Sequence, residues 1–345
     1  MRAGILERIE HLALREIPCP ELQSGSVLIR VKACSICGAD LRTYRYGHPR
    51  IKLPQILGHE IAGEVEAISD NVTDYRIGDR VVVTPRIACG ECYYCANGLD
   101  IYCENSLTFG YELPGGYADY MLIPPRGVKY GVLNKIAQDL SFEEASLAEP
   151  LSCCIRAQIA SKVSYGSTVV VIGGGPVGIM HCRLAKVNGA ERVLLIEKNI
   201  KRLEYVDQTA IDRIVDSSKS DPEIDIIAAT SGRGADVVIV ACSSSEAQRQ
   251  ALSIAGKGGR INFFGGLPSG KSIVSIDSNI IHYQEITVQG SHGATPRHTE
   301  EAISMLNKRV LGVSDIITHK FPLDSIISAF HLAEKKEGMR IAICP

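Results

Sequence analysis

The pattern of apolar positions changes about halfway along the chain. In the first part, short apolar runs such as 27–33, 61–68 and 80–84 alternate with glycine, proline and charged turns. From about residue 163, the apolar runs 169–172, 192–196, 235–241 and 260–264 are separated by longer amphipathic stretches. Short punctuated strands are typical of a β-rich domain, and strands alternating with helices are typical of a doubly wound parallel sheet. The pattern predicts an α/β protein with domains at 1–155 and 156–289.

The last part of the chain completes this picture. The run 286–290 reads as an edge strand of the second domain, and helical periodicity follows at 299–308 and 323–335. The closing apolar run 340–343 reads as a strand that returns to the first domain. We therefore expect the segment 290–345 to belong to the first domain.

One buried strand leads directly into a glycine motif. The β-branched run Val169–Ile172 continues into G-x-G-x-x-G, and a helix is predicted over 179–188. In such a motif the first glycine permits a tight turn, the second lets the backbone approach a pyrophosphate, and the third lets the helix pack against the strand. The pyrophosphate lies at the helix N-terminus, where free N–H groups and the helix dipole favour an anion. The motif predicts coenzyme binding at Gly173, Gly175, Pro176, Val177 and Gly178.

An acidic residue closes the next strand. The run 192–196 ends in Glu197, nineteen residues after Gly178. A carboxylate at this place accepts hydrogen bonds from the adenosine ribose and repels a 2′-phosphate, which favours NAD over NADP. Lys198 and Arg202 lie nearby and keep this preference from being absolute; Arg202 is itself a candidate cofactor-binding residue.

Charge and hydropathy exclude several function classes. The 345 residues include 37 Lys and Arg against 39 Asp and Glu, a net charge of −2, and no basic block stands out. This composition gives no indication of a nucleic-acid or anionic-membrane partner. No apolar run approaches the roughly 20 residues that span a bilayer, and the first residues lack the apolar run of a signal peptide. We expect a cytoplasmic protein.

Twelve cysteines indicate metal binding rather than a disulfide framework. Four of them are separated by steps of three, three and eight residues within one loop. Two close pairs can surround a tetrahedral Zn²⁺, and four thiolates leave no place for substrate. The spacing predicts a structural zinc site at Cys89, Cys92, Cys95 and Cys103.

A second metal site of a different kind is indicated by Cys37, His59 and Glu60. One thiolate, one imidazole and one carboxylate leave a coordination position open, as metal catalysis requires. Glu149, near the end of the first domain, offers a further carboxylate. The residues leave open whether Glu60 or Glu149 is the third ligand.

These motifs together resemble the zinc-dependent medium-chain dehydrogenases. The resemblance rests on the order Cys37-Gly38-x-Asp40, Gly58-His59-Glu60, the four-cysteine loop, Glu149-Pro150-Leu151 and the glycine motif, and it extends along the whole chain. It is greatest to the polyol and threonine dehydrogenase branch, which includes sorbitol and galactitol-1-phosphate dehydrogenases. It implies a GroES-like catalytic domain, a Rossmann NAD-binding domain, one catalytic and one structural zinc per subunit, and a homodimer or homotetramer.

The resemblance also implies an activity. A secondary alcohol of a polyol, sugar or polyol phosphate would pass hydride to NAD and become a ketone, reversibly. The alternatives are a threonine-type or simple secondary-alcohol dehydrogenase, a zinc-free reductase, and a dinucleotide-binding protein without catalysis. Metal content and coenzyme turnover distinguish them.

The chain departs from its relatives around the expected substrate. Ala39 stands where many relatives have a Ser or Thr that relays the proton, and Arg42 where threonine dehydrogenases have a His. We expect the proton to leave by another route, through water and Glu60, Thr43 or His48. Ser291 and His292 stand near where sorbitol dehydrogenases have an aromatic–arginine pair. The candidate substrate residues are Arg42, Thr43, His48, Ser291 and His292.

A basic cluster precedes the Gly58-His59-Glu60 motif and consists of Arg42, Arg45, Arg50 and Lys52. Guanidinium groups bind phosphate or carboxylate in a bidentate manner, so the cluster is a candidate anion site. The simpler interpretation, which we favour, is a set of solvated loop charges.

Overall fold

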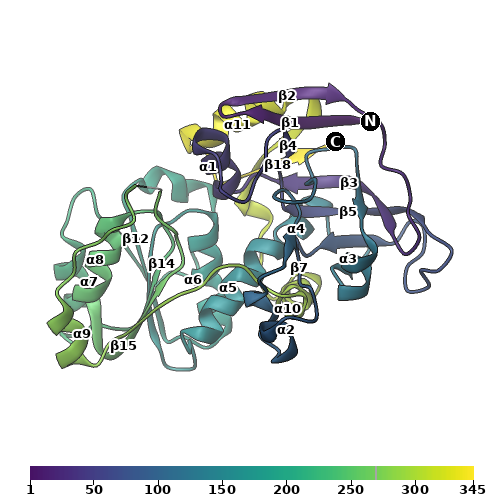
Figure 1. Ribbon diagram of the computed structural model, residues 1–345. Coiled ribbons are helices and arrows are strands. Elements are labelled where there is room, and N and C mark those ends of the chain that lie inside the picture. Colours follow the sequence, from purple (N-terminus) through teal and green to yellow (C-terminus); the bar gives the residue numbers. More distant parts are fainter. Residues whose placement is uncertain (269) are drawn as a thin grey trace. The chain divides into compact units, whose positions relative to one another are not determined.

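The computed structural model describes residues 1–268 and 270–345, which form two compact units (Figure 1). One unit consists of Met1–Ser152 and Gly293–Pro345, and the other of Cys153–His292. The borders predicted from the sequence were 155/156 and 289/290.

The first unit is built on a seven-stranded sheet. Its strand order is β10-β6-β5-β3-β18-β17, and β9 also pairs with β3. The bounds are β3 Val27–Ser35, β5 Glu60–Ile68, β6 Arg80–Val83, β9 Tyr120–Ile123, β10 Leu133–Lys135, β17 Ile317–Pro322 and β18 Arg340–Cys344. The predicted closing strand thus lies between β3 and β17, antiparallel to β3 and parallel to β17.

Smaller strands and helices surround this sheet. A three-stranded sheet, β2-β1-β4, and a β7–β8 pair lie in the same unit. Their bounds are β1 Arg2–Arg8, β2 His11–Glu16, β4 Gln55–Ile56, β7 Arg86–Ile87 and β8 Leu107–Thr108. The α-helices are α1 Gly38–Tyr46, α2 Tyr93–Ala96, α3 Pro125–Tyr130, α4 Phe142–Ser146, α10 Pro296–Asn307 and α11 Ile326–Lys335. The 3₁₀ helices are η1 Asp100–Tyr102, η3 Ser314–Ile316 and η4 Leu323–Ser325.

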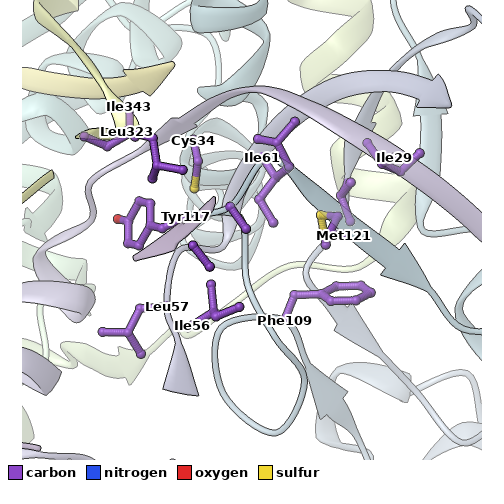
Figure 2. Packing of buried hydrophobic residues seen from close by; sticks show 14 of the residues in the cluster. Ile29, Cys34, Ile56, Leu57, Ile61, Phe109, Tyr117, Met121, Leu323 and Ile343 are labelled. Carbon is purple, nitrogen blue, oxygen red and sulfur yellow. The ribbon is translucent and has the colours of Figure 1, made fainter. Parts of the chain in front are cut away.

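The core of this unit lies around the middle strands. Ile29, Cys34, Ile61, Tyr117 and Met121 are almost wholly buried and pack together, as Figure 2 shows. Residues from β3, β5 and the segment leading to β9 therefore share one apolar cluster. Because β3 and β5 also carry the predicted metal ligands at their ends, this packing holds those ends together.

The second unit is a six-stranded parallel sheet in the order β13-β12-β11-β14-β15-β16. Its strands are β11 Thr168–Ile172, β12 Arg192–Glu197, β13 Arg213–Asp216, β14 Ala235–Val240, β15 Ala255–Phe263 and β16 Thr287–Gly290. Its helical segments are α6 Pro176–Val187, η2 Ile200–Tyr205, α7 Pro222–Ala229, α8 Ser245–Ile254 and α9 Ser278–Gln284. α5, Ala148–Ala160, begins in the first unit and ends in the second. The strand order is that of a doubly wound dinucleotide-binding sheet, with its switch point between β11 and β14.

The structure confirms the predicted fold class and revises several element bounds. α6 begins at Pro176 and not at residue 179, because proline fits the first helical position, where its missing N–H costs nothing. The predicted helix 323–335 is divided into η4 and α11. β13 was not predicted, since only four residues form it and polar residues flank them.

No helix within the described residues is long and apolar enough to cross a membrane.

Candidate active site

Cys37 stands where β3 has ended and α1 is about to begin. Its backbone is extended and forms the N-cap of α1. The Cys37 N–H donates to Asp40 Oδ2 at 3.0 Å, so the first turn of the helix fixes the orientation of the cysteine. A carboxylate in the first turn also suits the positive end of the helix dipole.

His59 and Glu60 stand at the start of β5, and Gly58 makes this arrangement possible. Gly58 has a φ of +92°, and a Cβ at this position would lie 2.7 Å from Cys34 Sγ. Glycine is the residue that accepts both constraints. His59 and Glu60 are buried, with exposed fractions of 7% and 0%.

The structure brings Cys37, His59 and Glu60 together. One potential ligand atom from each lies within 4.8 Å of the others. Neither carboxylate oxygen of Glu60 has a hydrogen bond within the described part of the chain. Buried polar atoms without hydrogen bonds are rare, so a thiolate, an imidazole and an unsatisfied carboxylate fit a metal ion.

The charges within this cluster favour a thiolate. Burial acts most strongly and would raise the pKa of Cys37, but the charge and hydrogen bond of His59 and the charge of Arg340 together outweigh burial, so the pKa is lowered. For His59 the signs are reversed: burial acts to lower its pKa, but Asp40 and Cys37 raise that pKa well above its usual range. An anionic sulfur is the form that binds metal.

A second layer of residues, absent from the predicted site, surrounds the ligands. His59 Nδ1 lies 3.3 Å from Asp40 Oδ1, and the buried Tyr117 hydroxyl donates to Asp40 Oδ2 at 2.8 Å. A carboxylate beside a ligating imidazole fixes its tautomer and ring orientation. Asp40 was visible in the sequence as the acid three residues after Cys37, but only the structure shows its contact with His59.

Arg340, on β18, is the other partner that sequence reasoning missed. Its guanidinium lies 3.1 Å from Glu60 Oε1 and donates to the Ile36 carbonyl at 2.8 Å. Burial raises the pKa of Glu60 well above its usual range, and Arg340 acts in the opposite direction. No local pattern could reveal this pair, because its members stand 280 positions apart in the sequence.

The remaining candidates of this unit lie near the cluster but outside it. Glu149, in the first turn of α5, is not part of the three-residue group, although its charge acts on Glu60 and Arg340. On α1, Thr43 is buried and Arg42 is exposed. His48 is half-buried, and its ring packs edge-on against Tyr111 at 5.0 Å between centroids.

The four predicted cysteines, which lie in the segment 86–108 (called the lobe below), also come together. Their sulfurs lie within 4.8 Å of one another, and all four are free thiols. The N–H groups of Cys89 and Cys92 donate to the sulfurs of Cys103 and Cys89 at 3.2 and 3.3 Å. The hydrogen bond from the Cys95 N–H is the main reason that the pKa of Cys92 is lowered to about 6. This donor set fits a closed tetrahedral zinc site.

Three side chains that the sequence did not single out hold this lobe. Arg126, on α3, donates to the carbonyls of Ala88 at 3.0 Å, Ile87 at 3.2 Å and Asn105 at 2.5 Å. Tyr130, one turn further along α3, donates to Asp100. From the other side, Arg86 donates to the Cys103 carbonyl at 3.0 Å.

In the second unit, the glycine loop has the geometry of a pyrophosphate cradle. Gly173 has a φ of +106°, and a Cβ on Gly178 would lie 1.8 Å from the Gly173 carbonyl oxygen. A Cβ on Gly175 would meet only the Arg202 guanidinium, at 3.6 Å. The fold itself thus requires glycine at the first and third positions of the motif. The second position, Gly175, faces open space beside the N-terminus of α6, where a ligand could approach the backbone.

Glu197 closes this loop. Its Oε2 accepts a hydrogen bond from the Gly174 N–H at 2.5 Å, and Oε1 accepts from the N–H groups of Lys198 and Asn199 at 2.9 and 2.7 Å. Three backbone N–H donors thus hold the Glu197 carboxylate at the end of β12. Arg202 extends from η2 toward the same loop.

Ser291 and His292 lie in the second unit, directly after β16. The Ser291 hydroxyl donates to Asn262 Oδ1 at 2.8 Å, and the Asn262 amide donates to Ser161 Oγ at 3.0 Å. The His292 carbonyl accepts from Arg156 at 3.2 Å. Their role toward a substrate stays a prediction.

Two of the four members of the basic cluster, Arg45 and Arg50, are engaged in ion pairs. Arg45 contacts both Glu10 and Glu334, and Arg50 makes a bidentate pair with Glu112 at 2.8 and 2.9 Å. Arg45 and Arg50 therefore fit neither interpretation given above: they do not form an open anion site, and they are not simply solvated charges.

Comparisons with known proteins agree with this geometry. Residues 23–130 match the alcohol dehydrogenase GroES-like domain, and residues 176–308 match the zinc-binding dehydrogenase family. The chain is 32% identical to L-threonine 3-dehydrogenase of Bacillus subtilis over 96% of this chain and 94% of that protein.

Solved structures show the same similarity. A zinc-binding dehydrogenase from Sinorhizobium meliloti bound to NADP is 28% identical, with a TM-score of 0.92 and coverage of 100% of this chain and 99% of the other. For 2R,3R-butanediol dehydrogenase from Bacillus subtilis, the identity is 27% and the TM-score 0.89, with the same coverage.

The predicted dehydrogenase resemblance is thus confirmed, together with zinc and a nicotinamide coenzyme as cofactors and small-molecule alcohols as the substrate class. With its GroES-like domain, its Rossmann sheet and its two clusters of metal-ligand residues, the chain belongs to the zinc-dependent medium-chain dehydrogenases, oxidoreductases that act on the CH–OH group.

Proposed function

We propose that this protein is an NAD-dependent dehydrogenase that oxidises a secondary alcohol of a polyol or sugar to the ketone, reversibly. The observation that carries the proposal is the buried group of Cys37, His59 and Glu60, whose ligand atoms converge within 4.8 Å and leave the Glu60 oxygens without hydrogen bonds. The same chain carries a glycine loop whose Gly174 N–H donates to the Glu197 carboxylate.

Each residue has a part in this chemistry. Cys37 and His59 would hold the catalytic zinc, with Glu60 or Glu149 as a further ligand, and the four cysteines of the lobe would hold the structural zinc. A bound catalytic zinc supplies Lewis acidity that lowers the pKa of the substrate hydroxyl. Asp40 would orient the imidazole, and Arg340 would hold the Glu60 carboxylate in place beside it. The glycine loop and α6 would bind the coenzyme pyrophosphate.

Glu197 supports NAD as the coenzyme. Its carboxylate is held at the end of β12 by three backbone N–H groups, so it would repel the 2′-phosphate of NADP from a fixed position. Arg202 beside Gly175 is the residue that would favour the phosphate. The similar protein from Sinorhizobium meliloti is bound to NADP, so the coenzyme of this chain needs its own test.

The ion pairs of Arg45 and Arg50 support an unphosphorylated substrate. Binding a phosphate there would require displacing Glu10, Glu334 or Glu112 from two guanidinium groups. A threonine-type activity is the second candidate, favoured by the identity of 32% to a threonine dehydrogenase over almost the whole chain.

We further propose a cytoplasmic homodimer or homotetramer. All cysteines of the chain are free, as expected in a reducing compartment. β16 is the last strand of its sheet, and its outer edge is a candidate for pairing with a second subunit.

The test is NAD⁺ reduction across free polyols, their phosphates, threonine and simple alcohols, with zinc-replete and chelated protein. We expect turnover of unphosphorylated polyols that is lost with the metal. Turnover of threonine alone would replace the proposal with the second candidate, and no turnover with two bound zinc ions would refute both.

A further inference from the structure

Tyr111 lies beside the predicted metal ligands without being one of them. Its ring packs edge-on against the His59 imidazole, with 6.0 Å between centroids, and His48 packs on it at 5.0 Å. The residue belongs to a turn that follows β8 and not to a regular element. A half-buried tyrosine against a ligand imidazole is placed to meet whatever binds at that cluster.

The turn that carries Tyr111 is held firmly by its neighbours. Arg50 makes two hydrogen bonds to the Glu112 carboxylate and one to Thr108 Oγ1, at 2.8, 2.9 and 2.9 Å. The same guanidinium lies 5.3 Å from the centre of the Tyr111 ring, and Gln55 donates to the Tyr111 carbonyl at 2.6 Å. Bidentate arginine–carboxylate pairs fix geometry as well as adding energy. The ring is therefore positioned before any substrate arrives.

The hydroxyl of Tyr111 is available for a further hydrogen bond. Among residues 1–268 and 270–345, no hydrogen bond of this hydroxyl is found, although the backbone N–H and carbonyl of the same residue are both bonded. The ring contact with His59 places Tyr111 beside the ligand cluster. A preorganised donor without a partner beside a metal cluster is what recognition of a second polar group on a substrate requires.

We propose that Tyr111 determines specificity for vicinal diols: when one substrate hydroxyl occupies the Cys37–His59–Glu60 cluster, the Tyr111 hydroxyl hydrogen-bonds the neighbouring hydroxyl. This inference rests on the proposed function and deepens it by naming the group that distinguishes a polyol from a simple alcohol. A site built to hydrogen-bond a substrate hydroxyl discriminates strongly against the analogue that lacks it. Arg50 and Glu112 act as positioning residues.

The test compares matched substrates and matched variants. The substrates are the best vicinal diol of the panel and its monodeoxy analogue, with 2,3-butanediol and 2-butanol as the smallest pair. Tyr111→Phe removes the hydroxyl and keeps the ring, and Tyr165→Phe, at a tyrosine that is 93% exposed, is the control. We expect Tyr111→Phe to lower kcat/KM for the diol about five- to tenfold, the loss of one hydrogen bond, and to leave the monoalcohol unchanged. An unchanged diol-to-monoalcohol ratio overturns the inference.

The positioning role and the dependence on the proposed function are tested separately. Glu112→Ala should shift the diol-to-monoalcohol ratio in the same direction as Tyr111→Phe, and Glu112→Asp should restore part of it. A change in overall rate without a change in this ratio overturns the positioning role.

Titration of the cobalt-substituted protein with the same alcohols, followed in the visible d–d bands, reports binding without turnover. Wild-type protein that binds the diol no better than the monoalcohol overturns the Tyr111 inference alone. A spectrum that responds to no alcohol overturns the proposed function together with the inference.

Discussion

The lobe of four cysteines, residues 86–108, should depend on Arg126 as well as on its metal. Arg126 donates to the carbonyls of Ile87 and Ala88 on one stem of the lobe and of Asn105 on the other, so a single side chain joins the two stems. Arg126→Gln keeps some length and polarity but removes the charge and the planar fork. We predict that this variant opens the lobe more often and releases its zinc faster.

The magnitude follows from the three hydrogen bonds. Hydrogen bonds to a charged group are worth about 1.5–3 kcal/mol each, but Arg126 is only half-buried and one of its nitrogens serves two carbonyls. A total of about 2–3 kcal/mol is therefore a reasonable expectation, which corresponds to roughly 30- to 150-fold in the opening equilibrium. Tyr130→Phe, which removes one bond to Asp100, should have a smaller effect in the same direction.

Two measurements check this prediction. Hydrogen exchange of peptides covering residues 86–108 reports the opening locally, and a chromogenic chelator reports zinc release. Lys129→Gln, at an exposed position of the same helix, is the control. If Arg126→Gln exchanges and releases zinc at the rates of Lys129→Gln, the stems are held by the thiolates alone and the reasoning is wrong.

Three further predictions concern titratable or charged side chains. His181 is fully buried, and burial lowers its pKa to about 3, below the ~6.5 of an unfolded chain. The folded protein therefore keeps its full stability above pH ~6.5, and its free energy of unfolding should fall by about 1.4 kcal/mol per pH unit between pH ~6.5 and pH 3. Urea midpoints should therefore decline more steeply below pH 6.5 for wild type than for His181→Gln. Arg340→Met should cost about 3–5 kcal/mol in urea unfolding, because Glu60 loses its buried partner, and Arg340→Lys should recover part of it. Glu197→Ser should raise the NADP-to-NAD ratio of kcat/KM at least about tenfold, and an unchanged ratio would mean that this carboxylate does not select the coenzyme.

Local motifs were the part of the structure that could be predicted from the sequence. The geometry of the glycine loop depends on neighbouring backbone positions, and the four cysteines lie within one loop, so in both cases the spacing in the sequence predicts the geometry. The alternation of apolar runs with amphipathic stretches was equally informative for the parallel sheet, because strands buried on both faces must be apolar throughout.

Contacts between distant segments could not be read in the same way. Arg126 binds carbonyl groups, which every residue possesses, so no sequence pattern marks its partners. The ion pairs of Arg45 and Arg50 depend on Glu334 and Glu112, whose proximity follows only from the completed fold. The position of Tyr111 against His59 likewise requires the turn after β8 to reach the start of β5.

The contacts of Arg340 suggest why β18, the last strand of the chain, returns to the sheet of the first unit. β18 lies next to β3, and β3 lies next to β5, so Arg340, the segment before Cys37 and the start of β5 meet at one end of three adjacent strands. A buried arginine–glutamate pair adds little net stability compared with apolar residues of the same size. Its presence beside Cys37 and His59 is therefore better explained by what it does for the cluster: the Arg340 guanidinium fixes the Glu60 carboxylate at 3.1 Å, and its charge opposes the rise in the pKa of Glu60 that burial causes. On this reasoning the last strand of the chain supports the predicted metal cluster, although it contributes no predicted ligand.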